Sequence, residues 1–285
     1  MNFEIFRVLV QQALAEDIGA GDITTTALIP PEARVRAAIV ARQKLVAAGL
    51  PLAKMVFTEL DPGLSCLSQV AEGGTAEAGA VLMRLEGRAR PILTGERTAL
   101  NFLQHLCGIA THTARFVATV KESRTVILDT RKTIPGLRKL QKYAVLMGGG
   151  ENHRFGLYDS VLIKDNHLAV VAGDGVGKIQ RAIRLSRGAL PRWGVEIEVE
   201  TVEEMREALE AGAEAILLDN FSPEELAEAV TLAGGRVRLE ASGGLDLESV
   251  FAAAATGVDC ISLGCLTHSA PAADIALDLE PDSSH

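Results

Sequence analysis

The sequence has few cysteines, no long apolar run and no excess of basic residues, and each lack excludes a class of protein. Its four cysteines show neither C-x-x-C spacing nor a disulfide-framework pattern, which favours a reduced, cytoplasmic protein. No uninterrupted apolar run reaches the roughly 18–20 residues that a membrane-spanning helix needs. The net charge of −9 disfavours general nucleic-acid binding, which usually needs a basic surface. We therefore expect a cytoplasmic protein with neither membrane nor nucleic-acid partners.

A secretory signal is also not expected at the start of the chain. The stretch MNFEIFRVLVQQALAEDIG has acids and glutamines where a signal peptide has a continuous apolar core. The length of 285 residues allows one large domain or two smaller ones, and it is sufficient to bury a substantial core.

Against this acidic background, residues 129–167 are locally basic. They hold seven Lys or Arg residues and four Asp or Glu residues, a local charge of +3 in a chain of −9. Gly148, Gly149 and Gly150 lie within the stretch, and glycine lets backbone N–H groups approach an anion closely. The stretch therefore predicts a pocket for small polyanions, and a solvated basic face is the alternative. The basic residues of the helical pattern within it, Arg138, Lys139 and Lys142, are expected on a solvated face.

From about residue 126 the chain repeats a short apolar strand, a turn and a helical pattern. The strands are expected at 126–129, 160–164, 195–199, 215–219, 237–241 and 260–264. The helices are expected at 136–147, 178–187, 202–212, 223–233 and 247–256. This alternation predicts parallel strands joined by right-handed crossovers. Six units are too few for an eight-stranded barrel, which leaves an incomplete barrel or an open sheet, and polar or glycine residues at every strand end favour the nearly closed ring.

Residues 1–110 follow a different pattern, with an amphipathic helical stripe near the start and short strands separated by turns. The strands are expected near 34–42 and 64–70, and a long helical pattern at about 98–120 is expected to join the two halves of the chain. The segment near 274–280 is apolar enough to pack back against the first half. The sequence therefore predicts two domains.

One strand carries acidic residues on a single face. In 195–199 and the residue that follows, Glu196, Glu198 and Glu200 alternate with apolar residues. The apolar face of a barrel strand meets the helices, so the glutamates should point inward, where carboxylates need cations, a metal or water. Asp219 ends the next strand and should lie beside them. Two such carboxylates could hold Mg²⁺, and a structural ion-pair cluster is the alternative.

Basic residues lie at or near the ends of other expected strands. Arg131 and Arg154 offer planar donor forks suited to carboxylates, and Lys132 and Lys164 add two ammonium groups. His153 could donate a further hydrogen bond. Glycine turns at the last two strand ends predict phosphate binding, and these are Ser242-Gly243-Gly244 and Leu263-Gly264-Cys265. The combination suits a substrate with carboxylates that reacts with a substrate with phosphates.

These residues resemble the quinolinate phosphoribosyltransferase family over nearly the whole chain. The matching stretches include EDIGAGDITT (16–25), ERTALNFLQHLCGIAT (96–111), DTRKTIPGLR (129–138), KYAVLMGGGENHRFGLYDSVLIKDNH (142–167), VEIEVE (195–200), LLDNF (217–221), EASGGL (240–245) and GVDCISLGCLTHS (257–269). The resemblance implies an N-terminal α/β sandwich domain over 1–110, on which 271–285 pack back, and an incomplete α/β barrel of about six strands over 111–270. It also implies a homodimer or hexamer, in which Arg97 reaches the substrate of a neighbouring subunit.

The implied reaction is that of a pentosyltransferase in de novo NAD biosynthesis. The phosphoribosyl group of phosphoribosyl pyrophosphate is transferred to quinolinate with decarboxylation, which gives nicotinate mononucleotide, pyrophosphate and CO₂. Mg²⁺ accompanies phosphoribosyl pyrophosphate. A Schiff-base lyase that uses a strand-end lysine and a non-enzymatic binding protein are the alternatives from other classes.

The resemblance also implies which residues act. The substrate-binding set is Arg97, Thr130, Arg131, Lys132, His153, Arg154, Lys164, Glu198, Asp219, Ser242, Gly243, Gly244, Leu263, Gly264 and Cys265. The arginines and His153 would bind the two carboxylates of quinolinate, and the glycine turns would hold phosphate groups. The catalytic residues would be Lys132, Lys164, Glu198 and Asp219. Glu198 and Asp219 would face the ribose and Mg²⁺, directly or through water, and here the resemblance selects Glu198 where alternation left Glu200 open.

Overall fold

The chain is divided into two units, one with an antiparallel sheet and one with a parallel sheet. The computed structural model describes residues 1–171, 177–192 and 194–280. The first unit contains Met1–Ala114, Lys139–Gly149 and the segment that begins at Ala270. The second contains Arg115–Arg138 and Gly150–Ser269. Of the predicted returning segment 271–285, residues 281–285 lie outside the described residues.

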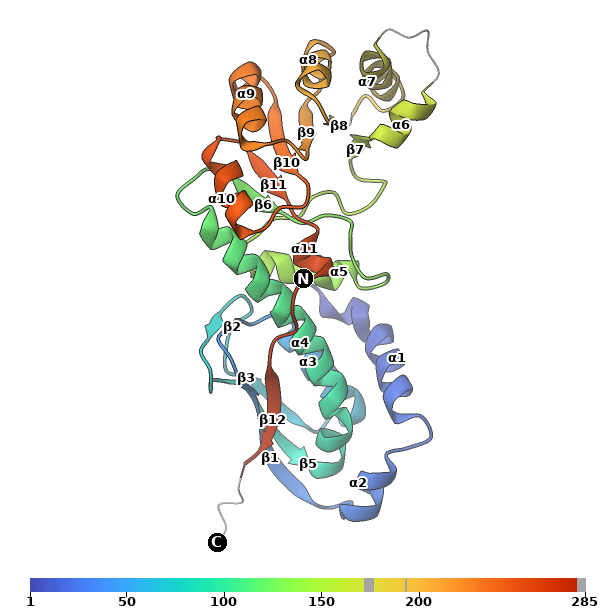
Figure 1. The fold of residues 1–285 in the computed structure, drawn as a ribbon. Helices are drawn as coiled ribbons and strands as arrows, with labels where there is room; N and C mark the ends of the chain where they lie inside the picture. Colours follow the sequence, from blue (N-terminus) through green and yellow to red (C-terminus); the bar gives the residue numbers. More distant parts are fainter. Residues whose placement is uncertain (172–176, 193, 281–285) are drawn as a thin grey trace. The chain divides into compact units, whose positions relative to one another are not determined.

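The second unit is built on a six-stranded parallel sheet in the order β6-β11-β10-β9-β8-β7 (Figure 1). The strands are β6 (Val126–Leu128), β7 (Val161–Ile163), β8 (Val195–Val199), β9 (Ala215–Asp219), β10 (Arg238–Ser242) and β11 (Cys260–Ser262). Each neighbouring pair is parallel, and within the described ranges no ladder joins β6 to β7. The fold class is therefore confirmed as an incomplete α/β barrel, because the ring of strands stays open between β6 and β7, the two ends of the sheet.

Helices alternate with these strands as the sequence predicts. They are α6 (Asp165–Val170), α7 (Lys178–Ala189), α8 (Val202–Glu210), α9 (Pro223–Ala233), α10 (Leu247–Ala255) and α11 (Cys265–His268). The start of α9 shows why the boundaries are predictable. The Ser222 hydroxyl accepts a hydrogen bond from the Glu225 N–H, while the Glu225 carboxylate accepts one from the Ser222 N–H. This capping box satisfies backbone donors that a helix start otherwise leaves without partners.

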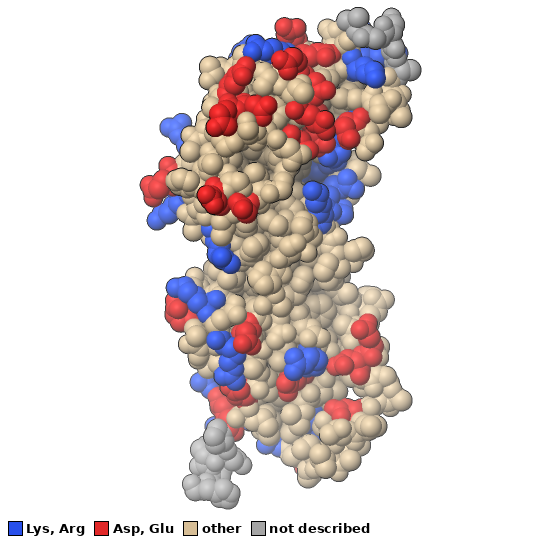
Figure 2. All heavy atoms as spheres, viewed as in Figure 1, with Lys and Arg blue, Asp and Glu red and all other residues tan. Residues whose placement is uncertain are grey.

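Acidic side chains gather over two helices of this unit. Figure 2 shows acidic side chains over α8 and α9 on the face in view. Both helices carry glutamates in their first turn, which are Glu203, Glu204, Glu224 and Glu225. Negative charge is favourable there because the N-terminal end of a helix is electropositive.

The first unit holds an antiparallel sheet in the order β12-β1-β5-β3. The strands are β1 (Arg34–Ala41), β3 (Ser65–Ser68), β5 (Val81–Arg88) and β12 (Ile275–Leu279), and β2 (Leu45–Val46) pairs separately with β4 (Thr75–Ala76). The helices are η1 (Phe3–Phe6), α1 (Arg7–Ile18), α2 (Ile23–Leu28), α3 (Leu50–Leu60) and α4 (Ala89–Thr119). The apolar segment near 274–280 thus forms a strand, and it pairs with β1. Among the described residues, no helix is both long and apolar enough to cross a membrane.

Helix α5 (Arg138–Met147) corrects two predictions about the basic stretch. Lys142 is fully buried, so it does not belong to a solvated face, whereas Lys139 is exposed. Gly148 packs against α4, since an added Cβ would lie 2.4 Å from the Ala110 carbonyl oxygen. The glycine therefore permits close packing of two helices and does not form an anion pocket. These contacts explain why Lys139–Gly149 belongs to the first unit although it falls within the predicted range 111–270.

Candidate active site

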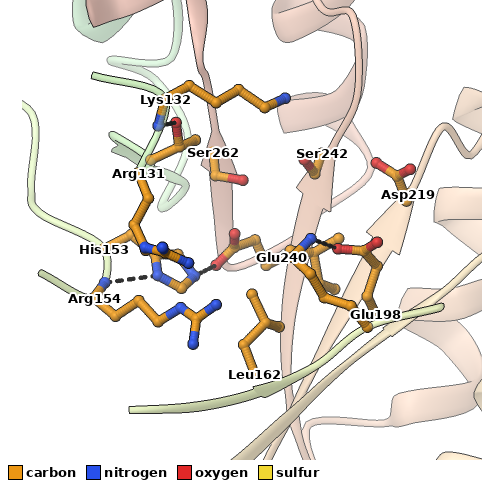
Figure 3. A pocket seen from close by; sticks show the side chains of 13 residues that line it. Arg131, Lys132, His153, Arg154, Leu162, Glu198, Asp219, Glu240, Ser242 and Ser262 are labelled. Carbon is orange, nitrogen blue, oxygen red and sulfur yellow. Dashed lines mark hydrogen bonds and ion pairs between the residues drawn. The ribbon is translucent and has the colours of Figure 1, made fainter. Parts of the chain in front are cut away.

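A cavity of about 460 Å³ lies at the carboxyl ends of the parallel strands (Figure 3). It is lined by Thr130, Arg131, Lys132, His153, Arg154, Leu162, Lys164, Glu198, Leu217, Asp219, Glu240, Ser242 and Ser262. The cationic residues predicted at the earlier strand ends and the acidic residues predicted at the later ones therefore meet in one place. Strand ends of an α/β barrel converge in this way because all strands run in the same direction.

A second cavity of about 410 Å³ is lined by the two glycine turns. Its lining residues are Lys132, Asp219, Asn220, Gly243, Gly244, Leu245, Leu263, Gly264, Cys265 and His268. Lys132 and Asp219 line both cavities, so the two spaces adjoin at this pair of opposite charges. Cys265 is half-buried, and burial raises the pKa of its thiol, which disfavours a nucleophilic role.

The turn after β10 has room only for glycine at its centre. Gly243 has a φ of +135°, and an added Cβ would lie 2.6 Å from the Asn220 side-chain oxygen. Asn220 is itself left-handed with a φ of +58°, and its N–H donates to the Ser242 carbonyl at 3.0 Å. Its side-chain amide donates to the Asp219 carboxylate at 2.9 Å. Asn220 was not among the predicted site residues, although an Asn directly after a strand-end Asp is a signal for such a turn.

The acidic face of β8 contains two inward glutamates and not three. Glu198 forms an ion pair with the Lys164 ammonium group and lines the first cavity. Glu200 is exposed, and it does not line either cavity. The prediction that all three glutamates point inward is wrong for Glu200, because the strand ends at Val199 and its alternation ends there.

Two arginines line the cavity and a third supports them. The buried Nε of Arg131 has no hydrogen-bond partner in the described part of the chain. The Arg154 guanidinium donates to the Ser160 carbonyl at 3.3 Å, and burial followed by the charge of Arg131 lowers the pKa of Arg154. Arg138 donates to the Thr133 hydroxyl and to the Phe155 and Arg131 carbonyls. It therefore holds the loop that carries Arg131, and its prediction as a solvated residue is wrong.

His153 lies above two buried carboxylates. Its Nε2 is 3.2 Å from a Glu196 oxygen and 3.3 Å from a Glu240 oxygen, and these glutamates are 3% and 0% exposed. Burial lowers the pKa of His153, but hydrogen bonds and charge from the two glutamates outweigh it and raise the pKa to about 9. Burial raises the pKa of Glu196, but His153 and Arg238 outweigh it and lower that pKa. Sequence reasoning missed Glu240, although it shares a face of β10 with Ser242 two residues later.

The same three residues present atoms that could ligate a metal, since these atoms all lie within 4.8 Å of one another. The hydrogen bonds of the ring oppose this. The Arg154 N–H donates to His153 Nδ1 at 2.7 Å, so the ring proton of neutral His153 lies on Nε2, the atom that would bind the metal. Glu198 and Asp219 offer oxygen ligands in the first cavity, which Asp219 shares with the second, and they are the better candidates for Mg²⁺.

Arg97 is the one predicted site residue that lies in the first unit. It is exposed on α4, and its guanidinium lies 3.8 Å from the Glu96 carboxylate. It is not among the residues that line either cavity. Its contact with a neighbouring subunit stays a prediction.

Known proteins are similar to this chain over nearly their whole length. Residues 22–107 and 109–278 match the family models for the N-terminal and C-terminal domains of quinolinate phosphoribosyl transferase. The probable nicotinate-nucleotide pyrophosphorylase (carboxylating) of Bacillus subtilis is 42% identical over 280 residues, which cover 98% of this chain and 95% of that protein. The nicotinate-nucleotide pyrophosphorylase (carboxylating) of Mycobacterium leprae is 43% identical, with 98% of each chain covered.

Solved structures agree with these similarities. The nicotinate-nucleotide pyrophosphorylase of Francisella tularensis superposes with a TM-score of 0.92 at 39% identity, and 98% of each chain is covered. The two family models together span both units of the fold, and the relatives match from end to end. The chain therefore belongs to the quinolinate phosphoribosyltransferase family.

Proposed function

We propose that this protein transfers the phosphoribosyl group of phosphoribosyl pyrophosphate to the ring nitrogen of quinolinate, with release of pyrophosphate and CO₂. The product is nicotinate mononucleotide, a precursor of NAD. The observation that carries the proposal is the pair of adjoining cavities, one lined by arginines and lysines and one by glycine turns. A dicarboxylate and a phosphorylated sugar require these two chemistries side by side.

Quinolinate binds in the arginine-lined cavity. Arg131 and Arg154 provide two guanidinium forks, which form paired hydrogen bonds with carboxylates. The buried Arg131 Nε supports this assignment, because a buried donor without a partner is costly unless a ligand supplies an acceptor. Thr130, Lys132 and Lys164 line the same space and complete the polar contacts.

Phosphoribosyl pyrophosphate binds at the junction and in the glycine-lined cavity. Its phosphate groups accept hydrogen bonds from the backbone of Ser242–Gly244 and Leu263–Cys265. Its ribose lies toward Glu198 and Asp219, whose charges stabilise the oxocarbenium-like transition state without forming a covalent bond. Lys132 contributes positive charge to the departing pyrophosphate from the position where both cavities meet.

Mg²⁺ is proposed as the accompanying ion. The donor set fits it, because this ion prefers oxygen ligands and commonly binds one or two carboxylates together with substrate phosphates. Glu198 and Asp219 would hold it, and when bound it supplies charge neutralisation for the pyrophosphate.

The chemistry then requires two steps. The quinolinate nitrogen forms a bond to ribose C1 while the bond from C1 to the pyrophosphate oxygen breaks. The bond between ring C2 and its carboxylate then breaks, CO₂ leaves, and the electron pair remains on C2 until a proton is added. Arg131 and Arg154 orient quinolinate through its carboxylates and stabilise the charge that develops at C2.

Three further properties are part of the proposal. The active assembly is a homodimer or hexamer in which Arg97 completes the site of a neighbouring subunit. The protein acts in the cytoplasm, which suits four cysteines that are all unbridged. The Lys164 side-chain nitrogen is engaged in an ion pair with Glu198, which argues against Schiff-base chemistry at this position.

The test is an assay of the purified protein with quinolinate, phosphoribosyl pyrophosphate and Mg²⁺. Pyrophosphate and CO₂ should form in equal amounts, and both should require all three components. Nicotinate lacks the 2-carboxylate and should be a poor substrate. Lys132→Ala should abolish product formation, while Lys139→Ala, on the exposed side of α5, should not. Folded wild-type protein that forms neither product would refute the proposal.

A further inference from the structure

Two buried carboxylates lie in the barrel interior beside the proposed quinolinate cavity. Glu196 and Glu240 project from β8 and β10 and are almost fully buried. Glu196 receives a hydrogen bond from Arg238 at 3.2 Å, but one buried oxygen of Glu240 has no hydrogen-bond partner among the described residues. Buried carboxylates reduce stability unless they are paired, so their presence calls for a functional explanation.

The common contact of the two glutamates is the ring of His153. Figure 3 shows the ring between Glu240 on one side and the backbone of Arg154 on the other. His153 is held at three atoms. Its backbone N–H donates to the buried Asp129 carboxylate at 2.9 Å, its Nδ1 accepts the Arg154 N–H at 2.7 Å, and its Nε2 meets the two glutamates. The ring therefore joins the barrel interior to the segment that carries Arg154.

We propose that Glu196 and Glu240 are positioning residues for quinolinate recognition, which act through His153 to fix the backbone and hence the guanidinium of Arg154. This inference rests on the function proposed above. The two carboxylates, at 3.2 and 3.3 Å from Nε2, favour a proton on that nitrogen, which leaves Nδ1 as an acceptor for the Arg154 N–H. A ring with its single proton on Nδ1 would instead place two donors against each other, and Arg154 would lose its support.

The contacts at the two ring nitrogens of His153 favour different protonation states. The charges of Glu196 and Glu240 favour a second proton on His153, whereas the Arg154 N–H opposes one at Nδ1. Nδ1 accepts the Arg154 N–H in this structure, so the ring proton that faces the two glutamates is the one on Nε2. In this state both nitrogens are engaged by the protein, and the contribution of His153 to quinolinate binding is made through Arg154.

A positioning role and a purely electrostatic role for Glu240 predict opposite changes in the KM for quinolinate. Quinolinate is a dianion, and Glu240 lines its proposed cavity. If Glu240 acted only through its charge, neutralising it would reduce repulsion and lower the KM for quinolinate. If Glu240 positions Arg154, removing its hydrogen-bond acceptor raises that KM even though the repulsion is gone.

The decisive variants are Glu240→Met and Glu240→Gln. Methionine has a similar volume but no acceptor for Nε2, whereas glutamine is neutral and keeps an acceptor oxygen. We expect Glu240→Met to raise the KM for quinolinate roughly ten-fold, the order expected when one charge-assisted hydrogen bond is lost. Glu240→Gln should stay close to wild type, and neither should change the KM for phosphoribosyl pyrophosphate. Glu200→Met is the matched control, because Glu200 is an exposed glutamate that directly follows β8, the strand that carries Glu196.

Two measurements make the route through Arg154 testable. In a double-mutant cycle, Glu240→Met should have little further effect on quinolinate KM once Arg154 is replaced by Ala, because both changes remove one coupled unit. Above the raised pKa of about 9, where the ring is neutral, the ring ¹⁵N shifts of His153 in wild-type protein should identify the Nε2–H tautomer. An Nδ1–H tautomer would overturn the proposal without any variant, and so would an unchanged or lowered quinolinate KM in folded Glu240→Met. Failure of the wild-type enzyme to use quinolinate would instead refute the proposed function.

Discussion

Gly243→Ala should selectively weaken binding of phosphoribosyl pyrophosphate. Gly243 lies in the turn after β10, where its φ is +135° and where an added Cβ would lie 2.6 Å from the Asn220 side-chain oxygen. Alanine rarely adopts this backbone conformation, and a contact of 2.6 Å requires atoms to move. The turn must therefore change its conformation, and the backbone of Gly243 and Gly244 that lines the second cavity changes with it.

The magnitude follows from the strain. A residue other than glycine in such a backbone region costs on the order of 1–3 kcal/mol. The affinity falls ten-fold for about every 1.4 kcal/mol, so the KM for phosphoribosyl pyrophosphate should rise roughly five- to hundred-fold if the turn must return to its native shape to bind phosphate. Gly243 does not line the arginine-rich cavity, so the KM for quinolinate should change little.

Steady-state kinetics with each substrate varied in turn measures this difference. Gly188→Ala is the matched control, because Gly188 lies in α7 with a negative φ and with nothing within 4 Å of an added Cβ. It should leave both KM values unchanged. A Gly243→Ala enzyme with an unchanged KM for phosphoribosyl pyrophosphate, or with equal losses for both substrates, would refute the assignment of this turn to phosphate binding.

Three further predictions concern recognition and stability. Arg131→Lys keeps the charge but loses the planar fork, so the KM for quinolinate should rise about ten-fold while the KM for phosphoribosyl pyrophosphate stays near wild type in the same assay. Ser222→Ala removes the cap of α9 and should lower the free energy of unfolding by about 1 kcal/mol, measured by urea denaturation, with the exposed Ser68→Ala as control. The Arg88 hydrogen bond and the Gly63 N–H hold the pKa of Asp61 below its ordinary value. The stability that Asp61 contributes is therefore present above its unfolded pKa and is lost as the pH falls through its lower folded pKa, so Asp61→Asn should flatten the acid side of the stability–pH curve.

Local signals made the barrel predictable. Every strand and helix expected between residues 126 and 264 is present, with bounds that differ by no more than two residues. Caps such as Ser222 and strand-end groups such as Asp219 depend on neighbours in the sequence. The sequence also predicts that strand-end residues meet at one cavity, because parallel strands bring their carboxyl ends together.

Long-range packing was not predictable in the same way. Lysine is a residue type typical of a solvated helix face, but Lys142 is fully buried. Gly148 lets the backbone at the end of α5 lie close to α4. Nothing near either residue in the sequence indicates these partners. Helix α3 and strand β5 were missed, and α4 begins at Ala89 and not near 98, because Pro91 is tolerated in a first turn. Glu240 was missed for the same reason, since its partner His153 lies in a loop far away in the sequence.

The pair Lys132 and Asp219 belongs to both cavities, and this sharing has a thermodynamic consequence. A ligand in one cavity changes the electrostatic environment and the freedom of two side chains that the other ligand also meets. The two binding free energies are therefore not additive. Whatever factor the first ligand imposes on the affinity of the second, the second imposes on the first, because linkage between binding sites is reciprocal. Separate affinities measured for the two ligands alone will not predict the affinity of the ternary complex.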